Sequence, residues 1–561
     1  MPKVIRGIEA LLDVLAAGGV RYIFGNPGTT ELPLNDALVN DARFQYILAL
    51  QEVPLLAMAD GYAMASKTLG VACVHISCGL GNAMGMLYNA HCEGTPLLVL
   101  AGQQDRRLKL GEPVLSGDVV RVARPWTKWA VEVECVADVP AAVRRAAQIA
   151  QTPPTGPVFL ALPLDVQMEP CPATDRSAPC IADHRVRPPA AAIASAADLL
   201  ARAERPAILA GSRVVESNGC CELAALAELI GAPIYSECAT SHGRLPVAAN
   251  HPLYAGPLPL WIPDVRRILD EFDVVLVVGM NLLRLYLHHE PAEPIPPRLP
   301  LIHLDSRAEE IGKNHPVQVG LIGDEKTGLA ELAEQLGVRQ TDGGQRRAGA
   351  AVEAGAARRS DERTALLAQI QNQQAQRPMT ALTLMGAIAR ALPPNAAVVE
   401  EAVTTQQFVL ERLGVLKDPT ALFAHRGWAL GWGLGCAMGV KLAWPDRPVL
   451  ALLGDGAAMY GVQGLWTAAH HRIPVVFVIC NNTEYKILKV CGDVMPLPEM
   501  QAHHHMGLDL AGPEIDFVGL AQALGVNACR VASPEELTDR VRTGLAGNTP
   551  ILIDAPIERS E

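Results

Sequence analysis

The sequence predicts an α/β protein with three doubly wound domains and mainly parallel sheets. Short apolar runs of roughly four to eight residues alternate with helical patterns along almost the whole chain, as in parallel sheets whose strands are joined by helices. The chain has 561 residues, which is too long for one hydrophobic core at about 150 residues per domain. Two stretches of different composition interrupt the alternation and set the expected boundaries.

The first interruption, residues 170–192, is rich in proline and charge and predicts a linker. The second, residues 341–363, is rich in alanine, arginine and glycine and predicts an exposed connector. We therefore expect a first domain over residues 1–180, a middle domain over 190–340, a linker over 341–377 and a last domain over 378–561.

The expected strands follow in order along each domain. The first domain contains "YIFG", "FQYILAL", "VACVHIS", "LLVLAG" and "VFLAL"; the middle domain "AILAG", "VVLVVG" and "LIHLD"; the last domain "AVVE", "VLALLGD", "VVFVICNN" and "ILIDA". Strands covered by helices on both faces are expected to be apolar almost throughout, as these are. The N-terminal stretch predicts an amphipathic helix and not a signal peptide, because Glu9 and Asp13 interrupt its apolar residues.

Composition excludes several classes of protein. The net charge of −12 argues against nucleic acid or an anionic membrane as the main partner. No uncharged apolar run approaches the 18 or so residues of a membrane span. The 13 cysteines form no C-x-x-C pair and favour reduced thiols in a cytoplasmic protein.

A glycine-rich turn in "CGLGNAMGM" offers a first candidate site. Gly79, Gly81 and Gly85 form G-x-G-x-x-x-G after an expected strand, and Asp105 follows 20 residues after Gly85. A nicotinamide-dependent oxidoreductase is one hypothesis, although the spacing departs from G-x-G-x-x-G. Close packing of a strand and a helix, or a different cofactor, are the alternatives.

The stretch "GDGAAMYGVQGLWTAAHHRIPVVFVICNN", residues 454–482, is the stronger candidate. Asp455 ends a buried strand and a helix begins after it, so main-chain N–H groups favour a phosphate there. The next strand returns to the same edge with Asn482, because parallel neighbours are joined by right-handed crossovers. Asp455, the Asn482 side chain and the main-chain carbonyl of Glu484 are hard oxygen ligands suited to Mg²⁺. Two unrelated turns are the alternative.

These residues carry a resemblance. The GDG-x24-NN pattern is similar to the fingerprint of the thiamine diphosphate (ThDP)-dependent decarboxylase and carboligase superfamily, and "FGNPGTTELP", "ADGYAMAS", "AGQQ" and "GPVFLALP" resemble its benzoylformate decarboxylase branch. The resemblance implies a pyrimidine-binding first domain, a middle domain and a diphosphate-binding last domain. It also implies ThDP and Mg²⁺ as cofactors, bound in the last domain by Gly454, Asp455, Gly456, Ala457, Asn482 and Tyr485.

The resemblance also assigns roles elsewhere in the chain. It implies that Glu52 shares a proton with the aminopyrimidine ring of the cofactor. Leu430 corresponds to the bulky residue beneath the bent cofactor, and the Trp428 carbonyl faces the pyrimidine amine. Thr404 falls where the family contacts the diphosphate, although a helix cap is equally compatible with it.

Proton transfer and substrate binding are expected from the first domain. His75 matches the family's active-site histidine, and Thr29 replaces a serine that binds the substrate carboxylate, so a hydroxyl is retained. Tyr286 stands where the family has a second histidine, and His288 and His289 follow closely. The second proton donor is left open among these three.

After the metal segment, Ile487, Leu488 and Cys491 correspond to the substrate pocket and suggest a pocket narrower than an aryl one. The run His503–His505 raises the alternative of a second metal site, but three adjacent side chains do not easily face one ion. We expect this run to belong to a loop or lid.

The predicted function is ThDP- and Mg²⁺-dependent, non-oxidative decarboxylation of a 2-oxo acid to an aldehyde and CO₂. The alternative is a carboligase or lyase similar to acetolactate synthase, for which FAD in the middle domain would be further evidence. The expected partners are a small 2-oxo acid or aldehyde, with no nucleic acid and no membrane. Because the family places the pyrimidine and diphosphate sites on different chains, we expect at least a homodimer, tetramers being usual.

Overall fold

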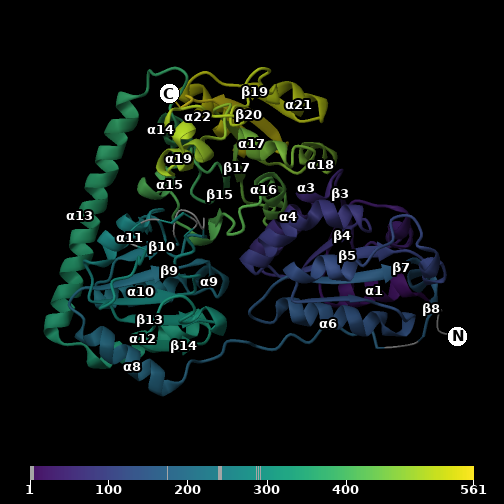
Figure 1. Ribbon diagram of the computed structural model, residues 1–561, viewed down its shortest axis with the longest axis horizontal. Helices are drawn as coiled ribbons and strands as arrows, with labels where there is room; N and C mark the ends of the chain where they lie inside the picture. Colours follow the sequence, from purple (N-terminus) through teal and green to yellow (C-terminus); the bar gives the residue numbers. More distant parts are fainter. Residues whose placement is uncertain are drawn as a thin grey trace.

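The computed structural model describes residues 5–172, 175–237, 243–285, 287–288, 290 and 292–560. Three α/β units follow one another along the chain (Figure 1). Each unit contains one six-stranded sheet, and within these sheets the paired strands are parallel. The predicted fold class is therefore confirmed.

The first sheet has the order β3-β2-β4-β5-β7-β6. Its strands are β2 (Tyr22–Gly25), β3 (Gln45–Leu48), β4 (Gly70–Val74), β5 (Leu97–Gln103), β6 (Trp129–Glu132) and β7 (Val158–Pro163), with helices α1 (Gly7–Ala17), α2 (Leu32–Leu38), α3 (Glu52–Ser66), α4 (Cys78–Glu93), α5 (Val119–Ala123), α6 (Val139–Gln151) and α7 (Leu164–Met168). A short antiparallel pair, β1 (Ile5–Arg6) with β8 (Pro170–Cys171), joins the two ends of this unit. Helix α1 is amphipathic as predicted, with Leu11 and Leu15 in the core and Asp13 paired with Arg43.

The middle sheet has the order β11-β10-β9-β12-β13-β14. It consists of β9 (Pro206–Ala210), β10 (Ile234–Ser236), β11 (Tyr254–Pro257), β12 (Val274–Val278), β13 (Leu301–Asp305) and β14 (Val319–Ile322), with helices α8 (Ala190–Arg202), α9 (Ser212–Glu216), α10 (Cys220–Ile230), α11 (Ile262–Leu269) and α12 (Glu325–Arg339).

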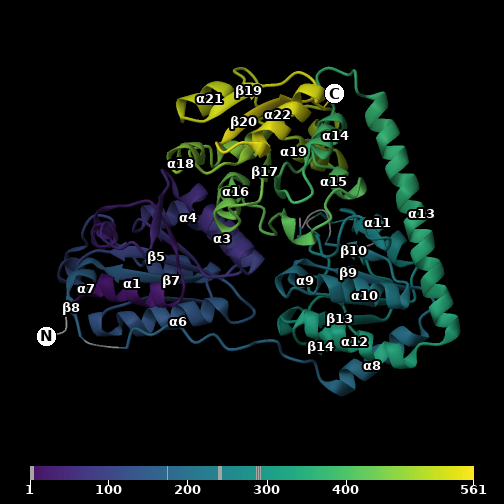
Figure 2. The ribbon, with the colours of Figure 1, turned by 180° about the vertical axis from the view of Figure 1, so that it is seen from behind.

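The predicted linker forms one long helix, α13 (Asp342–Asn372), of 31 residues. It runs along the outside of the molecule from the middle unit to the last one (Figures 1 and 2). Arg359 holds it in place by donating to the carbonyls of Tyr254, Ala249 and Glu411, which belong to the two units that it joins. Within the described residues, no helix combines the length and apolar composition needed to cross a membrane.

The last sheet has the order β16-β15-β17-β18-β20-β19. It contains β15 (Ala397–Glu401), β16 (Leu422–Phe423), β17 (Val449–Gly454), β18 (Val476–Asn481), β19 (Asn527–Arg530) and β20 (Ile551–Pro556), with helices α14 (Ala381–Ala391), α15 (Val409–Arg412), α16 (Trp432–Ala443), α17 (Asp455–Met459), α18 (Gly464–His470), α19 (Lys486–Val494), α20 (Pro498–Gln501), α21 (Phe517–Ala523) and α22 (Pro534–Ala546). The chain leaves β15 toward β16 on one side and continues through β17 and β18 on the other. The carboxyl ends of β15 and β17 therefore form a topological switch point, where open α/β sheets bind ligands.

The first and last units pack through α3 and α16, which approach backbone to backbone. A Cβ atom on Gly439 would lie 2.0 Å from the Met58 carbonyl oxygen, and one on Gly435 would lie 2.6 Å from that of Pro54. The indole nitrogen of Trp432 donates to Asp60 at 2.6 Å across the same interface. Glycines spaced four apart on one helix thus permit the contact between these two units.

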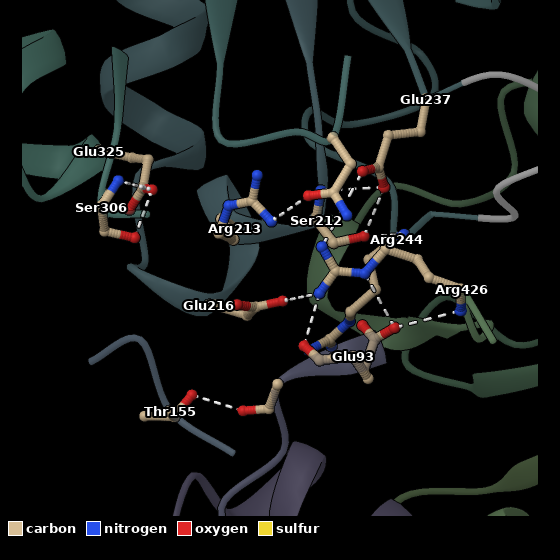
Figure 3. A network of polar contacts seen from close by, with 12 residues as sticks. Glu93, Thr155, Ser212, Arg213, Glu216, Glu237, Arg244, Ser306, Glu325 and Arg426 are labelled. Atoms are coloured by element: carbon tan, nitrogen blue, oxygen red, sulfur yellow. Dashed lines mark hydrogen bonds and ion pairs between the residues drawn. The ribbon is translucent and has the colours of Figure 1, made fainter. Parts of the chain in front are cut away.

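One buried guanidinium joins all three units (Figure 3). Arg426, which precedes α16, lies 3.1 Å from Glu93 at the end of α4 and 2.7 Å from Glu216 in α9. Glu237, after β10, is 3.9 Å away. Burial, together with the other carboxylates nearby, outweighs the guanidinium and raises the pKa of Glu93 to about 7. The arrangement of the three units thus depends on a buried, shared charge.

Candidate active site

The first half of the candidate site surrounds Glu52, the first residue of α3. The side chain is buried at 3% exposure. Asn26, after β2, donates to Oε1 at 2.9 Å, and Asn82, in α4, donates to Oε2 at 3.1 Å. Two amides from different elements thus fix both carboxylate oxygens, which is the arrangement of a positioned acid–base group.

His75 lies beside Glu52 and has a carboxylate partner of its own. Nδ1 of His75 is 2.7 Å from Oε2 of Glu31, which is almost fully buried. The other Glu31 oxygen accepts from the Thr30 hydroxyl and the Gly102 N–H, both at 2.8 Å. Glu31 therefore orients the imidazole, and such a carboxylate–imidazole pair is common where histidine transfers protons.

The glycine-rich turn serves close packing around these two groups. A Cβ atom on Gly79 would lie 2.7 Å from Oε1 of Glu52 and 2.9 Å from Cβ of His75. Ser77, just before α4, has φ of 46°, a left-handed conformation that a non-glycine residue adopts at some cost. Asp105 is paired with Arg107 in an exposed turn. Nothing in this geometry favours the dinucleotide hypothesis.

Thr29 is exposed and begins a short 3₁₀ helix, Thr29–Glu31, that also carries the partner of His75. A Cβ atom on Gly28 would overlap the His75 ring, at 1.9 Å from Nδ1. The Thr29 loop and the imidazole are therefore in direct contact, as the predicted roles in substrate binding and proton transfer require.

The second half of the candidate site is centred on Asp455, at the end of β17. It is 4% exposed, and its two oxygens accept from the main-chain N–H of Gly456 at 2.7 Å and of Thr483 at 2.6 Å. Burial raises the pKa of Asp455 to about 6. Among the described residues no cationic side chain forms an ion pair with Asp455, so its charge has no counterion in this part of the chain.

The other predicted metal ligands come from the segment after β18. Asn482 is buried, and its Oδ1 accepts from the Glu484 N–H at 3.1 Å. The Glu484 carboxylate is occupied by Lys489 at 2.6 Å and by the Ser560 hydroxyl at 2.8 Å, which leaves its main-chain carbonyl as the group that can bind a metal. A buried, uncompensated carboxylate beside amide and carbonyl oxygens fits a divalent cation such as Mg²⁺.

Main-chain contacts fix the segment that contains Leu430 from two sides. Asn89 of α4 accepts from the Ala429 N–H at 3.0 Å and donates to its carbonyl at 2.8 Å. Glu401, at the end of β15, accepts from the N–H groups of Gly431, Trp432 and Gly433, each at 2.9 Å. Leu430 itself is half-buried between these anchors.

Two further predicted residues are Trp428, in the same segment as Leu430, and Thr404, after β15. Trp428 has φ of 64°, and its main-chain N–H donates to Nδ1 of His425 at 3.0 Å. Thr404 is half-buried at the switch point, and the next helix, α15, has Phe408 as its N-cap. Thr404 is therefore not a helix cap, which removes that alternative.

The remaining predicted residues that the structure describes lie in three places: the β17–α17 turn, helix α19 with the residue before it, and the segment after β12. Gly454, Gly456 and Ala457 form the β17–α17 turn, and Tyr485 packs on Gly456, where a Cβ would lie 2.5 Å from its ring. On α19, Ile487 is half-buried, Cys491 is buried and Leu488 is 47% exposed.

His288 is exposed and pairs with Glu290. Tyr286 and His289 lie outside the described residues.

Sequence reasoning missed five positioning residues: Asn26 and Asn82, which hold Glu52, and Glu31, Asn89 and Glu401. Glu401 ends a buried strand in "AVVEE", a signal that could have been noticed, because a carboxylate at a strand end often meets a helix N-terminus. The partners of Glu31 and Asn89 lie 44 and 340 residues away, so no local pattern could have revealed them.

Comparison with known families agrees with this geometry. Family models match the N-terminal TPP binding domain of thiamine pyrophosphate enzymes over residues 5–118, their central domain over 193–332 and their C-terminal TPP binding domain over 402–555. The chain belongs to the thiamine pyrophosphate enzymes, and the predicted family is confirmed.

Individual relatives narrow the comparison. A benzoylformate decarboxylase of Pseudomonas aeruginosa is 33% identical over 557 residues, 99% of each chain. An acetolactate synthase large subunit of Parasynechococcus marenigrum is 27% identical over 578 residues, all of this chain and 89% of that one. The ThDP-dependent 4-hydroxybenzoylformate decarboxylase of Rhodococcus jostii has a similar structure, with a TM-score of 0.85 and 28% identity over 99% of this chain and 100% of that one. The chain is thus a ThDP-dependent enzyme similar to benzoylformate decarboxylases.

Proposed function

We propose that the chain catalyses Mg²⁺- and ThDP-dependent, non-oxidative decarboxylation of a benzoylformate-like 2-oxo acid to an aldehyde and CO₂. The observation that carries this proposal is the pair of half-sites. In the first half-site, Glu52 is held in place beside the pair of His75 and Glu31. In the second, the buried carboxylate of Asp455 has no cationic partner among the described residues. Full-length similarity to benzoylformate decarboxylases supports the choice of substrate class.

Each residue has a role within this proposal. Bound ThDP supplies the electron sink that loss of CO₂ requires. Asp455, Asn482 and the Glu484 carbonyl hold Mg²⁺, and the β17–α17 turn with Thr404 binds the diphosphate. Glu52, held by Asn26 and Asn82, would be the proton donor and acceptor for the aminopyrimidine of bound ThDP.

The remaining roles concern the substrate. Thr29 donates a hydrogen bond to the substrate carboxylate, and His75, oriented by Glu31, holds the proton that the product needs. Leu430 would pack against the bound cofactor, and Ile487, Leu488 and Cys491 would form part of the substrate pocket.

The proposal includes assembly as at least a homodimer, with a homotetramer as the expected form. Among the described residues, no hydrogen bond or ion pair connects Glu52, His75 or Thr29 with Asp455, Asn482 or Glu484. This is compatible with a site completed by the first unit of one chain and the last unit of another. The free state of every described cysteine supports a reducing, cytoplasmic location.

The test is CO₂ release with ThDP and Mg²⁺ present, comparing benzoylformate, pyruvate and branched aliphatic 2-oxo acids. Release from benzoylformate with free benzaldehyde is the expected result, and it would show that Ile487 does not close the pocket to an aryl group. Turnover should be abolished in Glu52→Ala, while metal-dependent binding of ThDP is partly retained. Full activity of that variant would contradict the proposed mechanism.

A carboligase similar to acetolactate synthase is the second candidate, because relatives of that kind match the whole chain. Under this alternative every 2-oxo acid releases CO₂ slowly, and acyloin products form when an aldehyde is added. Analysis of the products in the same experiment separates the two functions.

A further inference from the structure

A cluster of potential metal ligands lies beyond the Asp455 site, where α19 ends and the chain turns back after α20. Asp493, His503 and His505 each offer a ligand atom, and these atoms lie within 4.8 Å of one another. The two imidazole rings are 5.9 Å apart and nearly perpendicular. Small side-chain rotations can therefore direct all three groups at one ion.

The backbone explains why only two of the three consecutive histidines take part. His503 has φ of 60°, and its N–H donates to the Met500 carbonyl, so the chain turns sharply there. The side chain of His504 is directed to Glu499, at 2.7 Å from its carboxylate. The His run thus divides into a pair that faces Asp493 and a middle residue that has a different partner.

The close approach of α19 and α20 brings Asp493 to the histidines. A Cβ atom on Gly492 would lie 2.8 Å from Cε of Met500, so the two helices touch at a glycine. The segment after the histidines is held by the Tyr485 N–H, which donates to the Leu508 carbonyl, and by the Leu510 N–H, which donates to that of Thr483. Both ends of the loop are therefore fixed around the cluster.

A second observation also indicates a ligand. Nε2 of His505 is shielded from solvent and has no hydrogen-bond partner among the residues that the structure describes. Among the ion pairs of the described residues, none involves Asp493, so its charge is available as well. A buried imidazole nitrogen without a partner is costly unless a donor, a water molecule or a metal ion satisfies it.

We propose that Asp493, His503 and His505 bind a divalent transition-metal ion of the Zn²⁺ type. Two imidazoles and one carboxylate are typical of Zn²⁺, with water as the fourth ligand, whereas Mg²⁺ prefers oxygen ligands alone. The ion would join the end of α19 to the loop after α20. Since α19 also carries Ile487, Leu488 and Cys491, the metal would restrain one wall of the substrate pocket; this consequence rests on the proposed function, but the binding does not.

The experiment uses the full chain saturated with ThDP and Mg²⁺, titrated with Zn²⁺ in equilibrium dialysis, and measures the Zn²⁺ retained per chain. We expect His503→Ala and His505→Ala each to weaken Zn²⁺ binding by about 100-fold. His504→Ala is the matched control from the same run and should bind Zn²⁺ as the wild type does. Equal affinity in all four proteins, or an equal loss in His504→Ala, would overturn the proposal.

A measurement on the wild type alone avoids any variant that fails to fold. Limited proteolysis between residues 494 and 502 should become slower when Zn²⁺ is added to the Mg²⁺-saturated enzyme, and unchanged cleavage would count against the site. Neither measurement depends on turnover. If no 2-oxo acid is decarboxylated but Zn²⁺ binding still requires His503 and His505, the proposed function fails and the metal site stands.

Discussion

The carboxyl edges of the middle and last sheets each contain a buried aspartate, but only the aspartate of the middle sheet has a cationic partner among the described residues. In the middle sheet, Arg213 lies 2.7 Å from Asp305, both almost fully buried. Burial acts to raise the pKa of Asp305, but the guanidinium outweighs it and holds that pKa below its usual value. In the last sheet, Asp455 is also buried, and its hydrogen-bond partners among the described residues are main-chain N–H groups.

This difference separates a structural edge from a binding edge. A charge that is paired within the chain stabilises the fold and needs no ligand as its counterion. A buried carboxylate without a cation is unfavourable in the isolated chain and becomes favourable when a cation binds. Substitutions at the two edges should therefore have opposite effects on stability and on catalysis.

The largest effect is expected at the binding edge. Asp455→Asn should lower kcat/KM by about 1,000-fold, because the metal that holds the diphosphate loses its charged ligand. The stability of the cofactor-free protein should fall by no more than one hydrogen bond, about 1 kcal/mol. Steady-state kinetics and thermal unfolding measure the two quantities. A large loss of stability with little loss of activity would assign Asp455 to the structure.

Substitution at the carboxyl edge of the middle sheet should lower stability and leave activity unchanged. Arg213→Met leaves Asp305 buried without its counterion, and such a loss destabilises a protein by about 3–5 kcal/mol. Chemical denaturation measures this. The purified variant should keep its kcat at low temperature, since Arg213 is not part of the proposed active site. Arg339→Met, which removes a partly exposed ion pair with Asp198, is a control expected to change stability by less than about 1 kcal/mol.

A smaller effect is expected at Glu31, a positioning residue. Glu31→Gln keeps the shape of the side chain but removes the charge beside His75, so kcat should fall about 10- to 100-fold. The pH profile of kcat is the decisive readout, because Glu31 contacts Nδ1 of His75 directly. An unchanged pH profile would mean that Glu31 only supports the loop.

The smallest effect is the pH dependence of stability that arises from Glu93, which takes part in the contact among the three units. Because the folded-state pKa of Glu93 is raised to about 7 from a reference value of 4.5, the folded state binds more protons than the unfolded state between these values. Its contribution is therefore present below about pH 4.5 and is lost as the pH rises through 7. The melting temperature of the wild type, compared with that of Glu93→Gln, should fall over this range. A difference that does not vary with pH would show that Glu93 is ionised throughout.

Local patterns were sufficient for the fold class and for Asp455 and Asn482, but six strands of the three sheets were not expected, namely β6, β10, β11, β14, β16 and β19. Asp455 and Asn482 follow neighbouring parallel strands, so their proximity followed from the spacing alone, and the structure places them at one edge. The helix α13 was expected only as a connector, although its alanine and arginine content favours a helix. The partners of His75 and of the Leu430 segment depend on packing between distant elements, which no spacing reveals.

The His503–His505 run illustrates the same limit. The expectation that three adjacent histidines do not face one ion is met, because His504 turns away to Glu499. The partner that the other two share, Asp493, becomes their neighbour only because α19 and α20 meet at Gly492. Such a cluster requires the tertiary structure.

The most direct test of the account is the binding of ThDP to the wild type and to Asp455→Asn, with Mg²⁺ and after its removal with a chelator. The account predicts that the wild type binds ThDP only when Mg²⁺ is present, and that the variant binds none at concentrations that saturate the wild type. Binding of ThDP to the metal-free wild type, or to the variant at equal affinity, would contradict the claim that Asp455 binds a metal ion on which ThDP binding depends.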